Sequence, residues 1–294
     1  MAPAREHPRQ EIPFPHRASC IGLYSAAGIA AARQMSLELQ EWLQRLGLEV
    51  HRFCDDGAGQ DEEALARCDL LLTLGGDGTS LRAARLAAPH GVPLVCIGLG
   101  HLSFMAELTP DDVLKQLPSF LAGEYWLEKR TMLEGTVRRS GQEQGHFLVL
   151  NEIVLGRERC ALTLRVQARI NGEYLTTYVC DGVIVATATG STAYALSAGG
   201  PVIFPESRNL LLVPVAAHLS LLPPLIIPED AQVELEIVGG SGAGANADGQ
   251  PVCDLQRGDV VRVQRSATLC YFARLQSRNY FFSTLKARLY REWL

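Results

Sequence analysis

One carboxylate lies where the sequence otherwise prepares a site for an anion. Asp77 stands within the glycine-rich run 75–79, between an apolar run at 70–74 and an alanine-rich segment at 81–88. The apolar run predicts a buried strand, and the alanine-rich segment predicts a helix. A strand, a glycine turn and a helix together expose backbone N–H groups to an anion. A carboxylate beside bound phosphates is repelled unless it handles a proton or a metal ion, so Asp77 is a candidate for chemistry. It could instead simply cap the helix that follows.

A second segment, residues 181–201, opens with a short apolar strand and continues with small and hydroxylated residues. Hydroxyl groups and small side chains suit close contact with a polar ligand, and the ring of Tyr194 could cover a base. The alternative is a Ser/Thr-rich turn that caps a helix starting near Ala193. Glu152 follows the apolar run 147–150, where a charge needs a reason to approach the core.

Strands alternate with helices in the first part of the chain. The expected strands are 20–24, 49–53, 70–74 and 93–97, and the expected helices are 26–46, 61–67, 81–88 and 111–122. This alternation predicts an α/β domain with a mostly parallel sheet covered on both faces. Ligands of such sheets bind outside the carboxyl ends of the strands. Residues 75–79 and 98–105 both follow strands, so we expect both to face one crevice.

The pattern changes to period two after Trp126. Strands are expected at 148–150, 162–170, 174–179, 232–238 and 259–263, with a hairpin turn at Asn171-Gly172. The second domain is therefore expected to be all-β and sandwich-like. Residues 239–247, rich in glycine and alanine, are expected to form a mobile loop. Residues 280–294 return to a helical pattern and are expected to pack back on the first domain.

Composition restricts the class of protein. The chain has 294 residues, is 47% hydrophobic and carries a formal net charge of −5, which argues against a general nucleic-acid binder. Its eight cysteines form no C-x-x-C pair, so neither a zinc site nor a disulfide framework is suggested. The apolar stretch 210–227 contains three prolines and is not a membrane span, and residues 1–17 are not a signal peptide, so we expect a cytoplasmic protein.

Two common nucleotide-binding motifs are missing from the sequence. There is no P-loop motif. The dinucleotide fingerprint that begins at Gly98-Leu99-Gly100 has Ser103 at its third glycine position, which disfavours an ordinary hydride-transferring enzyme.

Three motifs give the chain a resemblance to the NAD kinase family, whose members use ATP or polyphosphate. They are the run 75–79, the pair Asn151-Glu152, and the segment 181–201, and the resemblance extends over about residues 20–289. The first motif is shared with lipid kinases and phosphofructokinase-like enzymes, whereas the third is highly characteristic of this family.

The resemblance implies transfer of the γ-phosphoryl group of ATP, or of polyphosphate, to the 2′-hydroxyl of the adenosine ribose of NAD. It implies that Asp77 is the general base and that Mg²⁺ or another divalent cation accompanies ATP. It also implies a homodimer or homotetramer that binds neither nucleic acid nor membrane. The implied substrate and nucleotide contacts are Gly76, Gly78, Thr79, Phe104, Asn151, Glu152, Val179, Asp181, Thr189, Thr192, Ala193, Tyr194, Ala195, Leu196, Ser197 and Gln250.

The expected domains follow from these sequence patterns, and the resemblance implies what two of them bind. They are a disordered tail at 1–18, an α/β nucleotide-binding domain at 19–125, a β-sandwich NAD-binding domain at 126–275, and a C-terminal segment at 276–294 that returns to the first domain.

Several positions depart from the family pattern. Gly98, Ser103, Leu162, Val179, Ala188 and Pro223 stand where other residues are common. These departures bear on the choice between NAD and NADH and on the choice of phosphoryl donor. An alternative reading is a non-catalytic NAD(P)-binding regulator on the same scaffold, and a lipid kinase is a third.

Overall fold

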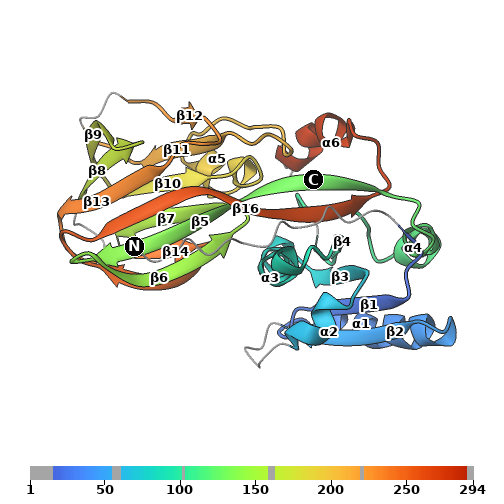
Figure 1. Cartoon of the computed structure of the whole chain (residues 1–294). Coiled ribbons are helices and arrows are strands. Elements are labelled where there is room, and N and C mark those ends of the chain that lie inside the picture. The colour runs from blue at the N-terminus through green and yellow to red at the C-terminus, as the bar shows by residue number, and fades with distance from the viewer. Residues whose placement is uncertain (1–15, 55–60, 101–102, 158–162, 219–221, 290–294) are drawn as a thin grey trace. The chain divides into compact units, whose positions relative to one another are not determined.

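The structure, a computed structural model, describes residues 16–54, 61–100, 103–157, 163–218 and 222–289. It divides into two compact units (Figure 1): unit 1 contains residues 1–129 and 267–294, and unit 2 contains residues 130–266. Two long strands, β5 (Trp126–Arg139) and β16 (Val260–Arg274), cross from one unit into the other. Most of the expected tail, residues 1–15, lies outside the described residues, as do Leu162 and residues 290–294.

Unit 1 is built on a parallel sheet in the order β2-β1-β3-β4. Its strands are β1 (Cys20–Ser25), β2 (Glu49–Cys54), β3 (Leu70–Gly75) and β4 (Leu94–Gly98), and Phe272 of β16 pairs with Leu94. Its helices are α1 (Ala30–Arg45), α2 (Glu62–Ala66), α3 (Asp77–Ala87), η1 (Ala88–His90), α4 (Val113–Leu121) and α6 (Tyr280–Leu289). The mostly parallel sheet predicted for this part of the chain is confirmed.

Helices cover both faces of the parallel sheet. Leu70, Leu72 and Leu74 of β3 pack in one cluster with side chains of α1 and α4. On the opposite face, Thr73 Oγ1 lies 3.0 Å from Ser80 Oγ of α3. Because both faces of β3 are buried, the strand reads as a continuous apolar run rather than as an alternation.

Two helices of unit 1 begin at other residues than expected. Helix α1 begins at Ala30 and not at Ala26, because Ala26 donates its N–H to Leu74 O at 3.1 Å and stays in the loop after β1. Helix α3 begins at Asp77 and not at Leu81, because Gly76 O accepts from Thr79 N at 3.0 Å and from Ser80 N at 3.2 Å. The glycine-rich run is therefore the first turn of the helix, and Gly76 is its N-cap.

Both ends of unit 1 are held in place. His16 Nε2 lies 2.8 Å from Asp69 Oδ1, and Ala18 donates its N–H to Leu121 O at 2.9 Å. The chain is thus tied down from His16 onward, before the expected end of the tail. At the other end, Tyr280 of α6 is buried and donates its hydroxyl to Glu128 Oε1 at 3.1 Å, which confirms that the C-terminal helix packs back on this unit.

Unit 2 consists of antiparallel strands that enclose one apolar core. One sheet has the order β12-β11-β10-β7-β14-β15. Its members are β7 (Glu152–Arg157), β10 (Gly182–Ala186), β11 (Leu210–Val215), β12 (Leu225–Ile227), β14 (Ala243–Ala247) and β15 (Gln250–Leu255). The facing strands are β5, β6 (Gln142–Val149), β8 (Leu164–Ile170), β9 (Glu173–Cys180), β13 (Val233–Gly239) and β16.

The structure tests two local expectations in unit 2. The hairpin at Asn171-Gly172 is confirmed, with φ of 53° and 83° at these two residues, between β8 and β9. The mobile loop expected at 239–247 is wrong, because residues 243–247 form strand β14 between β7 and β15. The side chains of Ala243, Ala245 and Ala247 are buried in the core, where small residues alternate as strand residues do.

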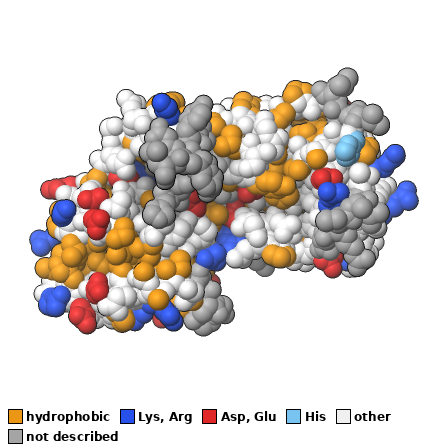
Figure 2. Space-filling view, turned by 180° about the vertical axis from the view of Figure 1, so that it is seen from behind, with side chains coloured by type: hydrophobic (Ala, Val, Ile, Leu, Met, Phe, Trp, Pro, Cys, Tyr) orange, Lys and Arg blue, Asp and Glu red, His pale blue; other side chains and the backbone are white. Residues whose placement is uncertain are grey.

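On the face seen in Figure 2, basic and acidic side chains are interspersed and form no broad field of one sign among the described residues. No helix in the described part of the chain is long and apolar enough to cross a membrane.

Candidate functional site

The turn after β3 brings backbone N–H groups to the amino end of α3. A Cβ added to Gly75 would lie 2.8 Å from Thr79 Cβ, so only glycine allows the strand to pass this close to the helix. Gly76 has an extended conformation, and Gly78 is exposed. The first N–H groups of a helix lack partners in the preceding turn and carry the positive end of its dipole. This end of α3 therefore suits a phosphate group.

The Asp77 carboxylate is held by the loop that follows β4. Phe104 N donates to Oδ2 at 3.0 Å, Met105 N donates to Oδ1 at 3.2 Å, and the Ser103 hydroxyl also donates to Oδ1. The expected meeting of residues 75–79 with the loop after the next strand is therefore observed. Asp77 does not act as the helix cap, since Gly76 occupies that position. Its half-buried carboxylate keeps lone pairs beyond these three bonds, because a carboxylate offers about four acceptor sites.

In unit 2, the turn at Asn151-Glu152 is fixed by a second carboxylate, that of Asp248. Its oxygens accept from the N–H groups of Leu150, Asn151 and Glu152 at 2.9, 2.8 and 3.2 Å. Asp248 and Gly249 both have positive φ, 48° and 76°, in the tight turn between β14 and β15. Asp248 is not among the residues expected at the site, although an Asp-Gly pair is itself a turn signal.

The segment that follows β10 packs directly on the Asn151 turn. Thr187 donates its N–H to Asn151 O at 2.9 Å and its hydroxyl to Leu150 O at 2.6 Å. A Cβ added to Gly190 would lie 2.6 Å from the carbonyl carbon of Asn151. Thr189 Oγ1 accepts from Arg130 Nη1 at 3.1 Å. The structure thus brings the second and third motifs together, and it adds Arg130, which sequence reasoning missed.

Two buried oxygens of this group have no hydrogen-bond partner among the described residues: Asn151 Oδ1 and Glu152 Oε2. Both residues are nearly inaccessible, with exposed fractions of 6% and 7%. Burial and, to a smaller extent, the nearby Asp248 carboxylate together raise the pKa of Glu152 to about 8. Buried polar atoms are nearly always satisfied, so two unsatisfied oxygens beside the segment that follows β10 point to a polar ligand.

The remaining residues of the third motif follow in the short helices η2 (Gly190–Thr192) and α5 (Tyr194–Ser197). Thr192 donates its hydroxyl to Thr189 O at 3.1 Å, and Ala193 links the two helices. Tyr194 and Ser197 are exposed, and Leu196 is half-buried. Ala195 is buried against β10 and β11, so its side chain has a packing role.

Three of the expected contacts lie elsewhere in unit 2. Gln250 opens β15 and pairs with Ala247, beside the Asp248 turn. Asp181 precedes β10 and forms an ion pair with Arg157 Nη2 at 2.8 Å. Val179 O accepts from His218 N at 2.7 Å.

The register of β10 separates Asp181 from the Asn151 turn. Gly182 is opposite Gly156, whereas Ala186 is opposite Glu152. At roughly 3.3 Å per residue, Asp181 is about 16 Å from that end of the strand. The structure therefore does not bring Asp181 to Asn151, and it places Val179 in β9, opposite Arg165 of β8.

One set of potential metal ligands occurs among the described residues. Ligand atoms of Cys20, Glu49 and His51 lie within 4.8 Å of one another. His51 Nε2 is 2.6 Å from Glu49 Oε1, so the two side chains already satisfy each other. Cys20 and Glu49 lie at the amino ends of β1 and β2, whereas Asp77 follows the carboxyl end of β3. This set therefore cannot serve the phosphate-binding turn.

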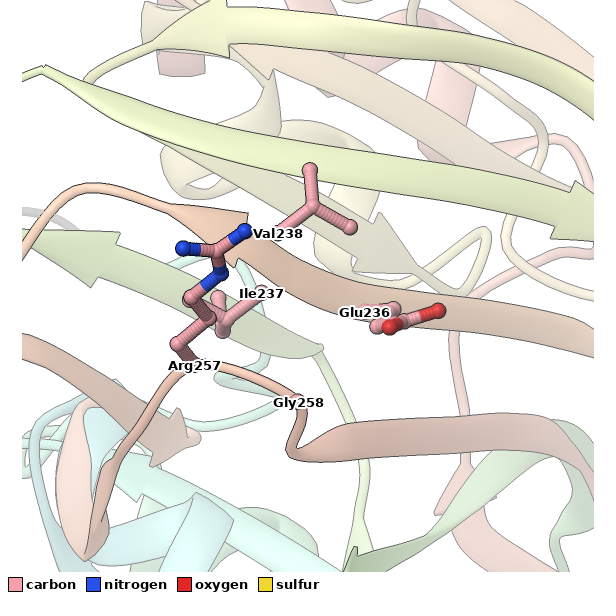
Figure 3. Close-up of a pocket in the computed structure, with 5 residues that line it drawn as sticks. All are labelled: Glu236, Ile237, Val238, Arg257 and Gly258. Carbon is pink, nitrogen blue, oxygen red and sulfur yellow. The ribbon is translucent and has the colours of Figure 1, made fainter.

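Unit 2 also has a surface hollow (Figure 3). It is lined by Glu236, Ile237, Val238, Arg257 and Gly258. None of these residues belongs to the three motifs.

Both parts of the chain match models of known protein families. The family model of the ATP-NAD kinase N-terminal domain matches residues 29–125, and that of the C-terminal domain matches residues 150–275. NAD kinase of Chloroflexus aggregans is 44% identical over 261 residues, which are 89% of this chain and 95% of the relative. NAD kinase of Chloroflexus aurantiacus (strain J-10-fl) is 43% identical with the same coverage.

Two solved structures are also similar. The crystal structure of yeast NADH kinase complexed with NADH has a TM-score of 0.83 at 24% identity, covers 95% of this chain and 89% of that chain, and bears on the fold alone. That of an NAD kinase from Archaeoglobus fulgidus in complex with ATP has a TM-score of 0.73 at 25% identity, with coverages of 91% and 99%.

Proposed function

The chain belongs to the NAD kinase family and is a phosphotransferase, and from this premise we propose that it phosphorylates the 2′-hydroxyl of the adenosine ribose of NAD. The donor in this proposal is ATP, with inorganic polyphosphate as the alternative. The observation that carries the proposal is the Asp77 carboxylate, oriented by three donors of the 103–105 loop at the amino end of α3.

Asp77 acts as the general base in this reaction. The O–H bond of the ribose hydroxyl breaks, and its proton passes to the carboxylate. The ribose oxygen forms a new bond to the γ-phosphorus while the bond to the β–γ bridging oxygen breaks, and ADP leaves. A ribose hydroxyl is a weak nucleophile, so a carboxylate within hydrogen-bond reach aids its attack. The rest of the catalysis is positioning and charge stabilisation.

The phosphates of the donor lie along Gly76, Gly78 and Thr79 in this proposal, where the positive end of the α3 dipole favours negative charge. A divalent cation carried by ATP would neutralise these phosphates and relieve their repulsion of Asp77. The site fits such an ion, because Mg²⁺ prefers oxygen ligands and the Asp77 Oδ2 atom accepts a single hydrogen bond from the described residues.

The dinucleotide contacts the Asn151 group of unit 2 in this proposal. Asn151 Oδ1 and Glu152 Oε2 would receive the hydroxyl donors that they lack. With its pKa raised to about 8 by burial, the Glu152 carboxyl is largely protonated near neutral pH, so it both donates and accepts a hydrogen bond. This matches a ribose hydroxyl, which also does both.

Further groups for the dinucleotide come from the end of the third motif and from the start of β15. Thr192, Tyr194 and Ser197 offer hydroxyl groups and a ring, and Gln250 offers an amide. Asp181, which precedes β10, lies too far from the Asn151 end of that strand to join the Asn151 group of the same chain. We also propose that the protein forms a homodimer or homotetramer, and light scattering of the purified protein would measure its mass in solution.

Turnover of the purified protein tests the proposal. With NAD, ATP and Mg²⁺ we expect NADP to accumulate in step with ADP, and the same assay with polyphosphate and with NADH identifies the preferred donor and acceptor. Binding of NAD, measured by calorimetry, without product from either donor would contradict the proposal and favour the non-catalytic regulator.

A further inference from the structure

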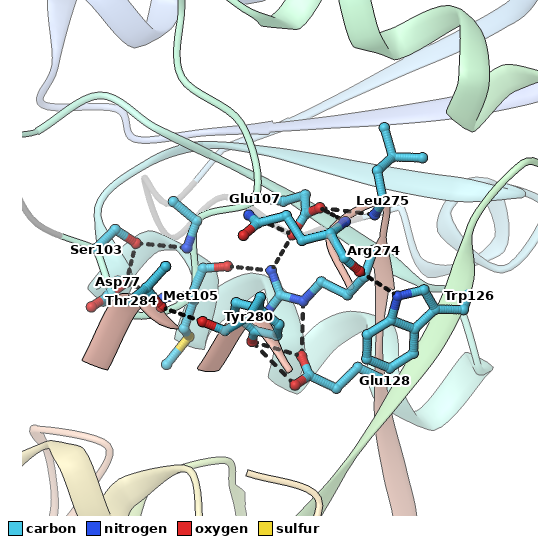
Figure 4. Close-up of polar contacts among 12 residues, drawn as sticks. Asp77, Ser103, Met105, Glu107, Trp126, Glu128, Arg274, Leu275, Tyr280 and Thr284 are labelled. Carbon is cyan, nitrogen blue, oxygen red and sulfur yellow. Dashed lines mark hydrogen bonds and ion pairs between the residues drawn. The ribbon is translucent and has the colours of Figure 1, made fainter. Parts of the chain in front are cut away.

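A fully buried arginine lies behind the loop that holds Asp77 (Figure 4). The Arg274 side chain of β16 has an exposed fraction of 0%. Its Nε donates to Glu128 Oε2 at 2.8 Å, and its Nη1 donates to Glu107 Oε2 at 3.0 Å. The guanidinium carbon lies 5.1 Å from the ring centroids of both Phe272 and Tyr280. Two carboxylates and two rings therefore fix the orientation of this side chain.

The two carboxylates are themselves held by backbone and side-chain donors. Glu107 Oε1 accepts from Leu275 N at 2.8 Å and from Gln276 N at 3.0 Å. Glu128 accepts from the Tyr280 hydroxyl, which ties the cluster to α6. Burying an ion cluster of this kind does not by itself add stability, because desolvation costs about as much as the charges gain. Its contribution must then be sought in the geometry that it imposes.

That geometry reaches Asp77 through one peptide group. Arg274 Nη1 also donates to the carbonyl oxygen of Met105 at 3.0 Å. The N–H of the same peptide, that of Ala106, donates to Ser103 Oγ at 2.9 Å. Ser103 Oγ in turn donates to Asp77 Oδ1, as does Met105 N. A chain of hydrogen bonds therefore runs from the guanidinium through a rigid peptide and a hydroxyl to the carboxylate.

We propose that Arg274 is a positioning residue for the phosphoryl transfer, which acts through the 105–106 peptide and Ser103 to fix the direction of the Asp77 lone pairs. The peptide group is planar, so its carbonyl cannot turn without also turning the N–H that orients Ser103. Hydrogen bonds in such chains polarise one another, and a charged donor at one end strengthens the next links. This inference rests on the proposed role of Asp77 as the base.

Arg274→Lys is the informative substitution. A lysine keeps the positive charge between the two glutamates, but its single ammonium cannot reproduce the fixed fork of donors that reaches Glu128, Glu107 and Met105 together. We expect kcat to fall roughly ten- to hundredfold, as small misplacements of reacting groups do, while KM for NAD and ATP changes less than about twofold. The matched control is Arg139→Lys in unit 2, where Arg139 donates from two nitrogens to Asp259. It should lower the thermal midpoint without changing kcat.

A double-mutant cycle with Ser103→Ala shows whether Arg274 acts along this path. Two residues on one path are not additive, so the double variant should lose little more kcat than the worse single variant. If Arg274→Lys fails to fold, Tyr280→Phe replaces it in the cycle, since it removes only the hydroxyl that holds Glu128; we expect a kcat loss of roughly two- to fivefold.

Three results would overturn the inference: an unchanged kcat, a change confined to KM, or additive losses in the cycle. Asp77→Asn alone distinguishes failure of the proposed function from failure of the inference about Arg274. If Asp77 is not the base, this variant keeps full turnover.

Discussion

Asp77, Glu152 and Asp248 are three carboxyl groups whose surroundings differ, and their roles differ with them. Asp77 accepts from three donors and keeps lone pairs for a substrate proton. Asp248 uses its oxygens on the backbone of the Asn151 turn. Glu152 is buried with one oxygen unsatisfied among the described residues, and burial raises its pKa to about 8. The first is suited to proton transfer, the second to support of a turn, and the third to binding as a neutral group.

The raised pKa of Glu152 predicts a pH-dependent stability. In the unfolded chain the pKa of this carboxyl returns to its ordinary value of 4.5. Between about pH 4.5 and 8 the folded protein therefore holds more protons than the unfolded chain. The free energy of unfolding should therefore fall as the pH rises through this window, by at most about 1.4 kcal/mol per pH unit. Glu152→Gln removes this contribution, so its stability relative to wild type should increase from about pH 5 to about pH 8 in urea denaturation.

The control for this prediction is Glu143→Gln, a substitution of an exposed carboxyl on β6. Its stability curve should run parallel to that of the wild type. Parallel curves for Glu152→Gln as well would show that the Glu152 carboxyl titrates no differently in the folded protein.

At the scale of elements, the site depends on close approaches between a turn and a strand or helix. Gly75 lets β3 pass over Thr79 of α3, and Gly190 lets the segment after β10 pass over the backbone of Asn151. At Gly190 the obstacle to a larger residue is backbone, which cannot rotate away as a flexible side chain can.

Gly190→Ala should therefore destabilise the folded protein strongly, although it adds only one methyl group. The added Cβ would lie 2.6 Å from the carbonyl carbon of Asn151, and overpacking of this kind costs about 1–3 kcal/mol. We also expect weaker NAD binding, because the displaced turn carries Asn151 and Glu152. Gly145→Ala on β6, where nothing lies within 4 Å of the new Cβ, is the matched control and should be nearly neutral. Equal urea midpoints for the two variants would contradict the prediction.

The same scale shows what the sequence could predict. The strand, turn and helix around Asp77 are formed by residues that are close together in the sequence, so the sequence pattern indicated them. The partners of Asp77 are 26 to 28 residues away, and the Asp248 contacts to the Asn151 turn span 96 to 98 residues. No local pattern contains such pairings. Strand β14 was missed because alanine and glycine also favour loops, and only its neighbours β7 and β15 make it a strand.

At the scale of the whole molecule, unit 2 is an insertion within the chain of unit 1. The sequence indicated the change from alternating strands and helices to period-two strands, because this is a change of local pattern. The sequence could not indicate that β5 and β16 belong to both units. Each is one continuous strand, so no break in its local pattern marks the boundary. Arg274 did leave a signal, as a charge within the apolar end of β16, but its meaning required the positions of Glu107 and Glu128.

The central claim is that Asp77 takes the proton of the ribose hydroxyl, and kcat of Asp77→Asn tests it most directly. An asparagine keeps one oxygen to accept from Ser103 and Met105 but turns its NH2 group toward the Phe104 N–H, so the thermal midpoint should fall modestly, whereas the NAD dissociation constant should remain close to that of the wild type. Loss of the base should lower kcat by about 10²–10⁴-fold. A variant that binds NAD and still forms NADP at nearly the wild-type rate would contradict the account.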